Sequence, residues 1–315
     1  MNSGYSTMVK SAGFGSTIRV HGLMLAATFL VATSFPVAAA IAGSLDSVVL
    51  TFVRFALATF LFAPLVVWRY GWAGPSSGDL LRYGALSLLL VTFFWCMFAA
   101  LRVTSPLNTA AIFALSPVIT AILATVLLRE RLSRSACIAL PIGAAGSIWV
   151  IFRGDIAALT ALRIGVSDLL FLGGTFALAA YSTLLKVLHR GEPMARMTFW
   201  ILASGTLWLL LLSIPSLGTV QWVDVPVEVF AGIAYLSVFT TIVTFFAFQW
   251  STAQIGPTRV VSYTLLNPAL VLVIGLALGD GLPTLSTWPG VLLTVIATIV
   301  LQEPSKTQGH ALADA

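Results

Sequence analysis

Two stretches decide the fold: TSPLNTAAIFALSPVITAILATVLLRERLS at residues 104–133 and IGPTRVVSYTLLNPALVLVIGLALGDGLPT at residues 255–284. Prolines occur at matching positions in both, as Pro106 and Pro117 in the first and Pro257 and Pro268 in the second. Each stretch continues as an apolar run and closes in a short polar turn. A proline inside a long apolar run predicts a membrane-spanning helix that is kinked near its middle. The matching pair indicates an internal repeat.

The composition excludes a water-soluble protein. Hydrophobic residues make up 59% of the chain and charged residues only 9%, whereas soluble domains carry roughly 25% charged residues. Lipid must therefore be the solvent for most of the chain. The net charge of +5 does not indicate nucleic-acid binding, because the basic residues lie between apolar runs. Cys96 and Cys137 lie within apolar runs, so neither a disulfide framework nor a metal site is expected.

Ten apolar runs are long enough to cross a bilayer, which requires about 20 residues. We expect an all-α polytopic membrane protein with flexible tails at 1–18 and 303–315. The ten predicted spans are 21–42, 47–68, 81–101, 104–128, 135–152, 167–187, 197–214, 227–251, 257–279 and 284–302.

The positions of the basic residues support this count. With ten spans and a cytoplasmic N-terminus, twelve of the sixteen Lys and Arg residues fall on the cytoplasmic side, as the positive-inside rule requires. The exceptions are Arg102, Arg153 and Arg163 outside and Arg54 within a span. Both termini are therefore expected in the cytoplasm of a cell whose inner membrane holds the protein.

The repeat extends beyond the two opening stretches. Thr28-Phe29 in the first span matches Thr175-Phe176 in the sixth, and residues 94–106 match residues 245–257. The unit is therefore five spans, predicted at 19–152 and 165–302. An odd number of spans reverses the second copy, which predicts two inverted five-helix repeats.

These features resemble the EamA branch of the drug/metabolite transporter superfamily. The resemblance is carried by LTFVRFALATFLF at residues 50–62, by ALSPVITAILATVLLRERLS at residues 114–133 and by NPALVLVIGLALGDGLPT at residues 267–284. It covers residues 20–302 and implies ten helices in two inverted repeats. It also implies transport of small metabolites, often the export of amino acids.

Pro117 and Pro268 are candidate hinges. A proline removes one backbone hydrogen bond, which here would free the carbonyls of Phe113 and Thr264. In lipid such carbonyls should face protein or a wet cavity, so the paired kinks are predicted to line a central path. The alternative is that they only shape helix packing.

Polar residues near these prolines are candidate substrate contacts, because polar groups at membrane depth usually face the bundle interior. The alternative role for such residues is hydrogen bonding between helices. The candidates in these two spans are Asn108, Ser116, Tyr263 and Asn267.

Arg54 is the basic residue inside a span, where an unpaired charge is costly. It is predicted to bind an anionic group such as a substrate carboxylate; the alternatives are snorkelling or pairing with Asp46. Trp95, Tyr181 and Gln249 are further candidates. A minority of the aromatic residues could stack on a substrate, although most should pack or face lipid, and Gln249 is polar at depth.

We therefore expect a secondary transporter that exports small metabolites such as amino acids by alternating access. An importer or exchanger of the same fold is the first alternative. A polytopic membrane enzyme is a second and weaker one, because the spans lack the His, Asp or Glu clusters of metal or acid–base catalysis. No catalytic residue, metal or cofactor is expected. The expected partners are a small-molecule substrate and the lipid bilayer, with no nucleic acid, in a monomer or homodimer.

Overall fold

The computed structural model describes residues 14–41, 43–72, 74–101, 103–104, 106–161, 164–279 and 282–303. Within these ranges the chain is helical and has no strand, and ten helices are long and apolar enough to span a membrane. The predicted count of ten spans is thus confirmed. The tails lie outside the described residues, apart from residues 14–18, which begin the first helix, and Glu303.

The first repeat contains α1 to α6, with one span divided in two. The bounds are α1 Phe14–Ile41, α2 Ser47–Tyr70, α3 Ser77–Leu101, α4 Pro106–Phe113, α5 Ser116–Leu127 and α6 Arg134–Ile151. Local capping fixes several starts: the Asp46 carboxylate accepts the amide protons of Val48 and Val49 at α2, and Ser133 Oγ accepts that of Ala136 at α6. The short α7, Ile156–Thr160, lies in the link to the second repeat.

The second repeat contains α8 to α14 and has two interrupted spans. Its bounds are α8 Val166–Leu188, α9 Met194–Leu217, α10 Val227–Ser237, η2 Val238–Val243, α11 Thr244–Ile255, α12 Pro257–Ser262, η3 Tyr263–Leu266, α13 Asn267–Leu278 and α14 Trp288–Gln302. The short 3-10 turns η1, Trp222–Asp224, and η4, Leu285–Thr287, precede α10 and α14. The seventh span was expected to stop at Ile214, but α9 continues through Pro215 to Leu217. Proline interrupts the helix less there because it lies in the last turn.

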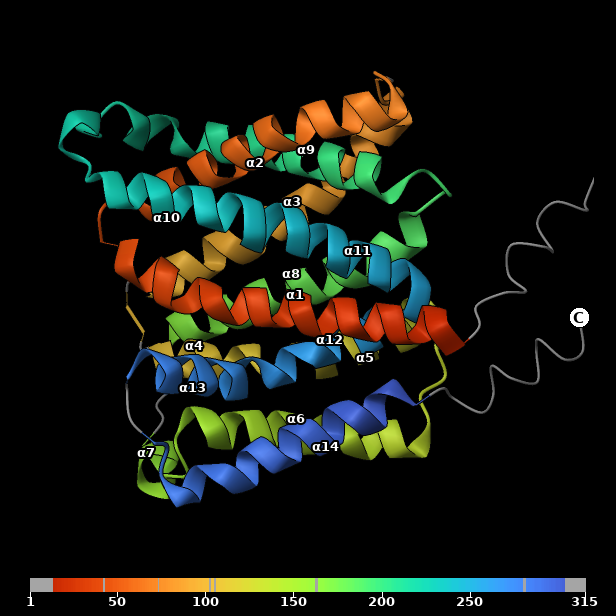
Figure 1. Ribbon diagram of the computed structural model, residues 1–315, viewed down its shortest axis with the longest axis vertical. Helices are drawn as coiled ribbons and strands as arrows, with labels where there is room; N and C mark the ends of the chain where they lie inside the picture. Colours follow the sequence, from red (N-terminus) through yellow and green to blue (C-terminus); the bar gives the residue numbers. More distant parts are fainter. Residues whose placement is uncertain are drawn as a thin grey trace, which may run out of the picture.

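The two repeats pack around a pseudo-two-fold axis. The helix α2 packs against α9 and α6 against α14, so each of these four meets its own counterpart. The pair α3–α8 is likewise matched by α1 against α10 and α11. Figure 1 shows α2 with α9 at one edge of the molecule, α6 with α14 at the other, and the remaining spans between them.

Two reciprocal contacts locate this axis. The hydroxyls of Thr59 on α2 and Thr206 on α9 are 3.0 Å apart. At the other edge, a Cβ built on Gly146 would lie 3.0 Å from the carbonyl oxygen of Gly290, and one on Gly290 would lie 2.8 Å from that of Gly146. A pseudo-two-fold axis through both contacts would relate the two repeats. The second repeat is therefore an inverted copy of the first.

The ends of the bundle differ in charge. The turns at 71–72, 128–133 and 189–193 lie at the right of Figure 1. Because these turns hold Arg129, Arg131 and Arg190, we call this the arginine-rich end. The turns before α2, α10 and α14 lie at the opposite end. The largest core cluster lies between these ends and is rich in aromatic residues: Phe55 of α2 meets Phe94 of α3 and Phe245 of α11 edge to face.

Candidate functional site

Three spans are interrupted near their middles. The helix α4 ends at Phe113 and α5 begins at Ser116, while the ninth span passes through the 3-10 turn η3 before α13 begins at Asn267. The eighth span contains a π-helical turn, η2. Such irregular backbone inside a membrane occurs where it is buried in protein or lines a cavity, and π-turns are frequent at functional sites.

The two candidate hinge prolines each begin a half-helix. Pro117 is the second residue of α5 and Pro268 the second residue of α13. Proline is well suited there, because the first amides of a helix have no intrahelical acceptor and its φ is already helical. The prediction that Thr264 has a free carbonyl is wrong. The 3-10 turn lets the amide of Asn267 donate to that carbonyl.

Unpartnered polar side chains lie at both breaks. Ser116 is 1% exposed and Asn267 is 4% exposed. Among the described residues, neither the Ser116 hydroxyl nor either polar atom of the Asn267 amide has a hydrogen-bond partner. The hydroxyl of Thr120, one turn along α5, is buried in the same way. Buried polar groups are normally paired, and the described residues supply no partner for these groups, so they are available to bind a substrate.

Arg54 on α2 is bound to the π-turn. Its Nε donates to Thr241 Oγ1 at 2.7 Å, and its Nη2 donates to the carbonyl and the hydroxyl of Thr240 at 2.8 and 3.1 Å. The hydroxyl of Ser237 donates to the carbonyl of Arg54 from the other side. Thr241 also donates to the carbonyl of Leu236, five residues earlier, which is the spacing that a π-turn produces. The turn therefore presents its threonines to the guanidinium.

In the described part of the chain, no acid pairs with the guanidinium. Among the described residues Arg54 makes no ion pair, and its Nη1 donates no hydrogen bond. Asp46, the acid expected as an alternative partner, caps the start of α2 instead. The ring of Phe94 lies 5.8 Å from the Arg54 Cζ. A half-buried cation with one unused donor edge is suited to bind an anion.

Tyr181 and Gln249 form a link between helices. Gln249 Nε2 donates to the Tyr181 hydroxyl at 2.9 Å, and Thr198 Oγ1 donates to Gln249 Oε1 at 2.7 Å. All three side chains are buried, and they join α8, α9 and α11. Interhelical hydrogen bonding was the alternative role for such polar residues. Thr198 carries no signal in the sequence that would have placed it here.

This link lies where two groups of helices meet. In one group α3, α4 and α5 pack on α8, and in the other α10, α11 and α13 pack on α1. The contacts that join the groups are those of α8 with α11 and of α5 and α8 with α12. Each of these contacts involves α5, α11 or α12, which are the segments of the interrupted spans next to the arginine-rich end. At the same end the Thr258 hydroxyl donates to the Glu130 carboxylate. Within the described ranges, the helices of the two groups therefore pack most closely next to the arginine-rich end.

The other candidates lie apart from Arg54. The Tyr263 hydroxyl lies 2.6 Å from His21 Nδ1 on α1. Asn108 lies at the end opposite the arginines and donates to Asp168, which is 2% exposed and also accepts from Thr104 and the amide of Gly165. Trp95 is exposed on the same stripe of α3 as Leu81 and Leu88. The structure thus joins Tyr181 to Gln249 but does not gather all eight candidates in one site.

Comparison with known proteins defines the family. The family described as “EamA-like transporter family” matches residues 19–152 and 165–302, most of the chain. This chain belongs to the EamA-like transporter family. A relative from Bacillus subtilis (strain 168), named “Uncharacterized transporter YyaM”, is 27% identical over 183 residues, which is 58% of this chain and 60% of the relative. The alignment therefore covers less than two thirds of that protein.

A solved crystal structure shares the fold of this EamA-like transporter. It is 16% identical, covers 90% of this chain and 96% of its own, and superposes with a TM-score of 0.73. The ten spans, the two repeats and the family together identify a multi-pass membrane protein. The cation at Arg54 and the unpartnered groups at the helix breaks are its candidate substrate contacts.

Proposed function

We propose that this EamA-like transporter exports small metabolites that carry a carboxylate, such as amino acids, across the cytoplasmic membrane by alternating access. The observation that carries the proposal is the uncompensated charge of Arg54, whose side chain is fixed by Thr240 and Thr241. A carboxylate is the anion that a guanidinium edge binds best in a small metabolite. The arginine-rich end then faces the cytoplasm, as the positive-inside rule predicts.

Alternating access agrees with the packing described above. Among the described residues the two helix groups pack most closely near the arginine-rich end, which supports a conformation that is closed towards the cytoplasm if this end faces it, as proposed. Arg54 lies in the half of α2 next to the opposite end, from which a substrate would be released. Opening the other way requires the contacts of α8 with α11 and α12 to separate. The pseudo-two-fold axis exchanges the two ends of the bundle. The equivalent helices of the other repeat can therefore close the opposite end in the alternative state.

The breaks at Ser116 and Asn267 are proposed as further substrate contacts, with Pro117 and Pro268 as hinges. Each half-helix begins near the middle of the membrane, where its first amides carry partial positive charge. A carboxylate and the unpartnered hydroxyl and amide groups are complementary at such a place. We assign Tyr181 and Gln249 to closure of the cytoplasmic end, because each is already hydrogen-bonded.

The test of Arg54 uses the purified protein in proteoliposomes loaded with a mixture of radiolabelled amino acids. In Arg54→Gln we expect transport of the responding substrate to fall by about 10- to 100-fold, because a charge-assisted hydrogen bond contributes about 1.5–3 kcal/mol. Arg69→Gln is the matched control, since Arg69 is exposed in the last turn of the same helix. Unchanged transport in well-folded Arg54→Gln protein would remove the substrate role.

Direction is tested in whole cells. Cells that express an exporter should tolerate toxic analogues of its substrate better than cells that express the Arg54→Gln variant. Greater sensitivity in the wild-type strain would instead identify an importer. A screen across amino-acid, organic-acid and amine analogues would also test the carboxylate preference, because the amines should give no difference.

A further inference from the structure

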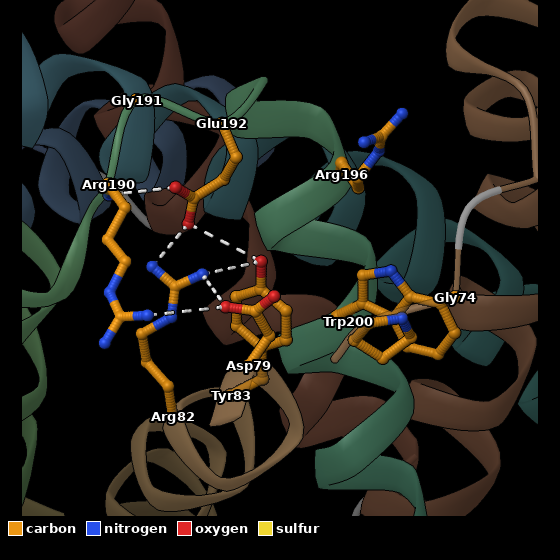
Figure 2. Close-up of a pocket in the computed structure, with 10 residues that line it drawn as sticks. Gly74, Asp79, Arg82, Tyr83, Arg190, Gly191, Glu192, Arg196 and Trp200 are labelled. Atoms are coloured by element: carbon orange, nitrogen blue, oxygen red, sulfur yellow. Dashed lines mark hydrogen bonds and ion pairs between the residues drawn. The ribbon is translucent and has the colours of Figure 1, made fainter. Parts of the chain in front are cut away.

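A cavity of about 480 Å³ lies at the arginine-rich end, apart from Arg54 and the helix breaks. It is bounded by the turn after α2, the first turns of α3 and the turn between α8 and α9. Figure 2 shows the charged side chains on one side of the cavity and Trp200 with Arg196 on the other. The lining residues that matter here are Asp79, Arg82, Arg190, Glu192, Arg196 and Trp200.

Arg82 forms ion pairs with both acids of the cavity. Its Nη2 lies 2.9 Å from Asp79 Oδ1 and its Nη1 lies 2.9 Å from Glu192 Oε1. It also donates to the Tyr83 hydroxyl and to the carbonyl of Leu188. The side chain is only 5% exposed, so this cluster is a fixed wall of the cavity and joins α3 to the α8–α9 turn.

Positive charge remains after these pairs are formed. Arg196 donates to the neutral carbonyl of Tyr70 and makes no ion pair among the described residues. The Arg190 side chain is 68% exposed and reaches Asp79 only at 3.9 Å. The Nε of Arg82 is buried without a hydrogen-bond partner in the described part of the chain. Three arginines against two acids leave the cavity with a net charge of +1.

The cavity lies at the depth of lipid headgroups. Trp72 contacts Trp200 with ring centroids 6.1 Å apart, and Trp68, one turn earlier on α2, is 83% exposed. Exposed tryptophans gather at the membrane–water interface. The helix α9 starts beside the cavity at Met194, and its N-cap Pro193 contributes no side-chain hydrogen bond. The N-terminal end of the α9 dipole adds partial positive charge there.

We propose that this cavity binds the phosphate of an acidic phospholipid, of which phosphatidylglycerol is the representative example. A phosphodiester carries one negative charge, which matches the net charge of the cavity. Arg190 and Arg196 each keep guanidinium N–H groups that can donate to its oxygens beside their contacts with Asp79 and with the Tyr70 carbonyl, and Trp72 and Trp200 can contact the glycerol and acyl chains. Basic pockets between membrane helices on the cytoplasmic side are known headgroup sites. A zwitterionic lipid fits less well, because its ammonium would find both carboxylates already paired.

The test measures lipid retention by the full-length protein in detergent, using native mass spectrometry with phosphatidylglycerol, phosphatidylcholine or inorganic phosphate added. We expect phosphatidylglycerol to be retained in preference to the other two. The Arg190→Gln/Arg196→Gln variant should lose about 30-fold in affinity, since each arginine near an acidic headgroup contributes about 5-fold. Arg190→Lys/Arg196→Lys keeps the charge and should retain most of the binding.

The matched control is Arg131→Gln/Arg134→Gln, which removes two exposed arginines of the same end outside the cavity. It should lose less than about threefold, because exposed distant charges are screened. An equal loss in both double variants would overturn the proposal, as would equal retention of the two lipids by the wild type. Displacement of the lipid by inorganic phosphate at low millimolar concentration would overturn the lipid assignment. If the double variant does not fold, Arg190→Gln alone decides, with an expected loss of about fivefold.

Discussion

Removing the hydroxyl of Tyr181 should favour the conformation that is open at the arginine-rich end. This hydroxyl accepts a hydrogen bond from Gln249 Nε2 at 2.9 Å. The bond joins α8 to α11 and therefore the two helix groups. It can exist only while that end is closed. In Tyr181→Phe the closed state loses the bond, whereas the open state, in which both groups reach water, loses little.

The magnitude follows from burial. A buried neutral hydrogen bond contributes about 0.5–1.5 kcal/mol net, and an unsatisfied buried donor costs about 1–3 kcal/mol. Gln249 keeps its bond from Thr198, so only its amide nitrogen is left without a partner. A destabilisation of the closed state by about 1–2 kcal/mol then shifts the equilibrium by about 5- to 30-fold.

A cysteine introduced at position 251 reports the opening. Ser251 lies on α11 two residues after Gln249, is fully buried, and its hydroxyl has no hydrogen-bond partner in the described part of the chain. Ser251→Cys should therefore be tolerated, in a protein whose Cys96 and Cys137 are replaced by alanine. The rate of labelling by a water-soluble maleimide should rise in Tyr181→Phe by the same factor as the equilibrium.

The control removes an interhelical hydroxyl that does not join the two groups. Thr206→Val breaks the 3.0 Å contact with Thr59 between α2 and α9, which lies on the pseudo-two-fold axis. Labelling of the introduced thiol should stay at the parental rate there. If Tyr181→Phe labels no faster than its parent while folding normally, or if Thr206→Val labels equally fast, the closure does not depend on this bond.

Two further changes probe the scaffold and the end opposite the arginines. In Gly146→Ala the new Cβ would lie 2.8 Å from a side-chain carbon of the facing helix, so thermal unfolding should show that the free energy of unfolding falls by about 1–3 kcal/mol. The control is Gly173→Ala, where no atom lies within 4 Å of the new Cβ, and its stability should not change. An equal loss of stability in Gly173→Ala would refute the reasoning. Asp168→Asn places an amide against three hydrogen-bond donors and should cost about 2–4 kcal/mol, measured in the same way. Asp155→Asn, at an exposed cap, should cost less than about 1 kcal/mol, and a similar loss in both aspartate variants would contradict the argument.

The membrane architecture could be predicted because it follows from composition and spacing. Apolar run length gave ten spans, and the positions of the basic residues gave a consistent orientation. The matched prolines and the Thr28 and Thr175 pair indicated the repeat, which packing between counterpart helices confirms. These signals are local or periodic and need no knowledge of which helices touch.

The contacts of the site could not be predicted in the same way. Arg54 stood out as a charge inside a span, but nothing in the sequence paired it with Thr240 and Thr241. The adjacent threonines in an apolar run were a usable hint of irregular backbone. The π-turn itself depends on hydrogen bonds that only the folded bundle supplies. Likewise, the Thr264 carbonyl was predicted to be free because Pro268 cannot donate a hydrogen bond to it. In the 3-10 turn η3 the amide of Asn267 donates to this carbonyl instead.

The crossing of α6 and α14 has a consequence for how the chain could be divided. Gly146 and Gly290 each press a carbonyl towards the other, so each half brings its own copy of the mating surface. A break in the peptide at α7 would therefore separate two fragments that recognise each other through equivalent surfaces, as in a two-fold dimer. Co-expressed as separate polypeptides, they should reassemble into a functional protein.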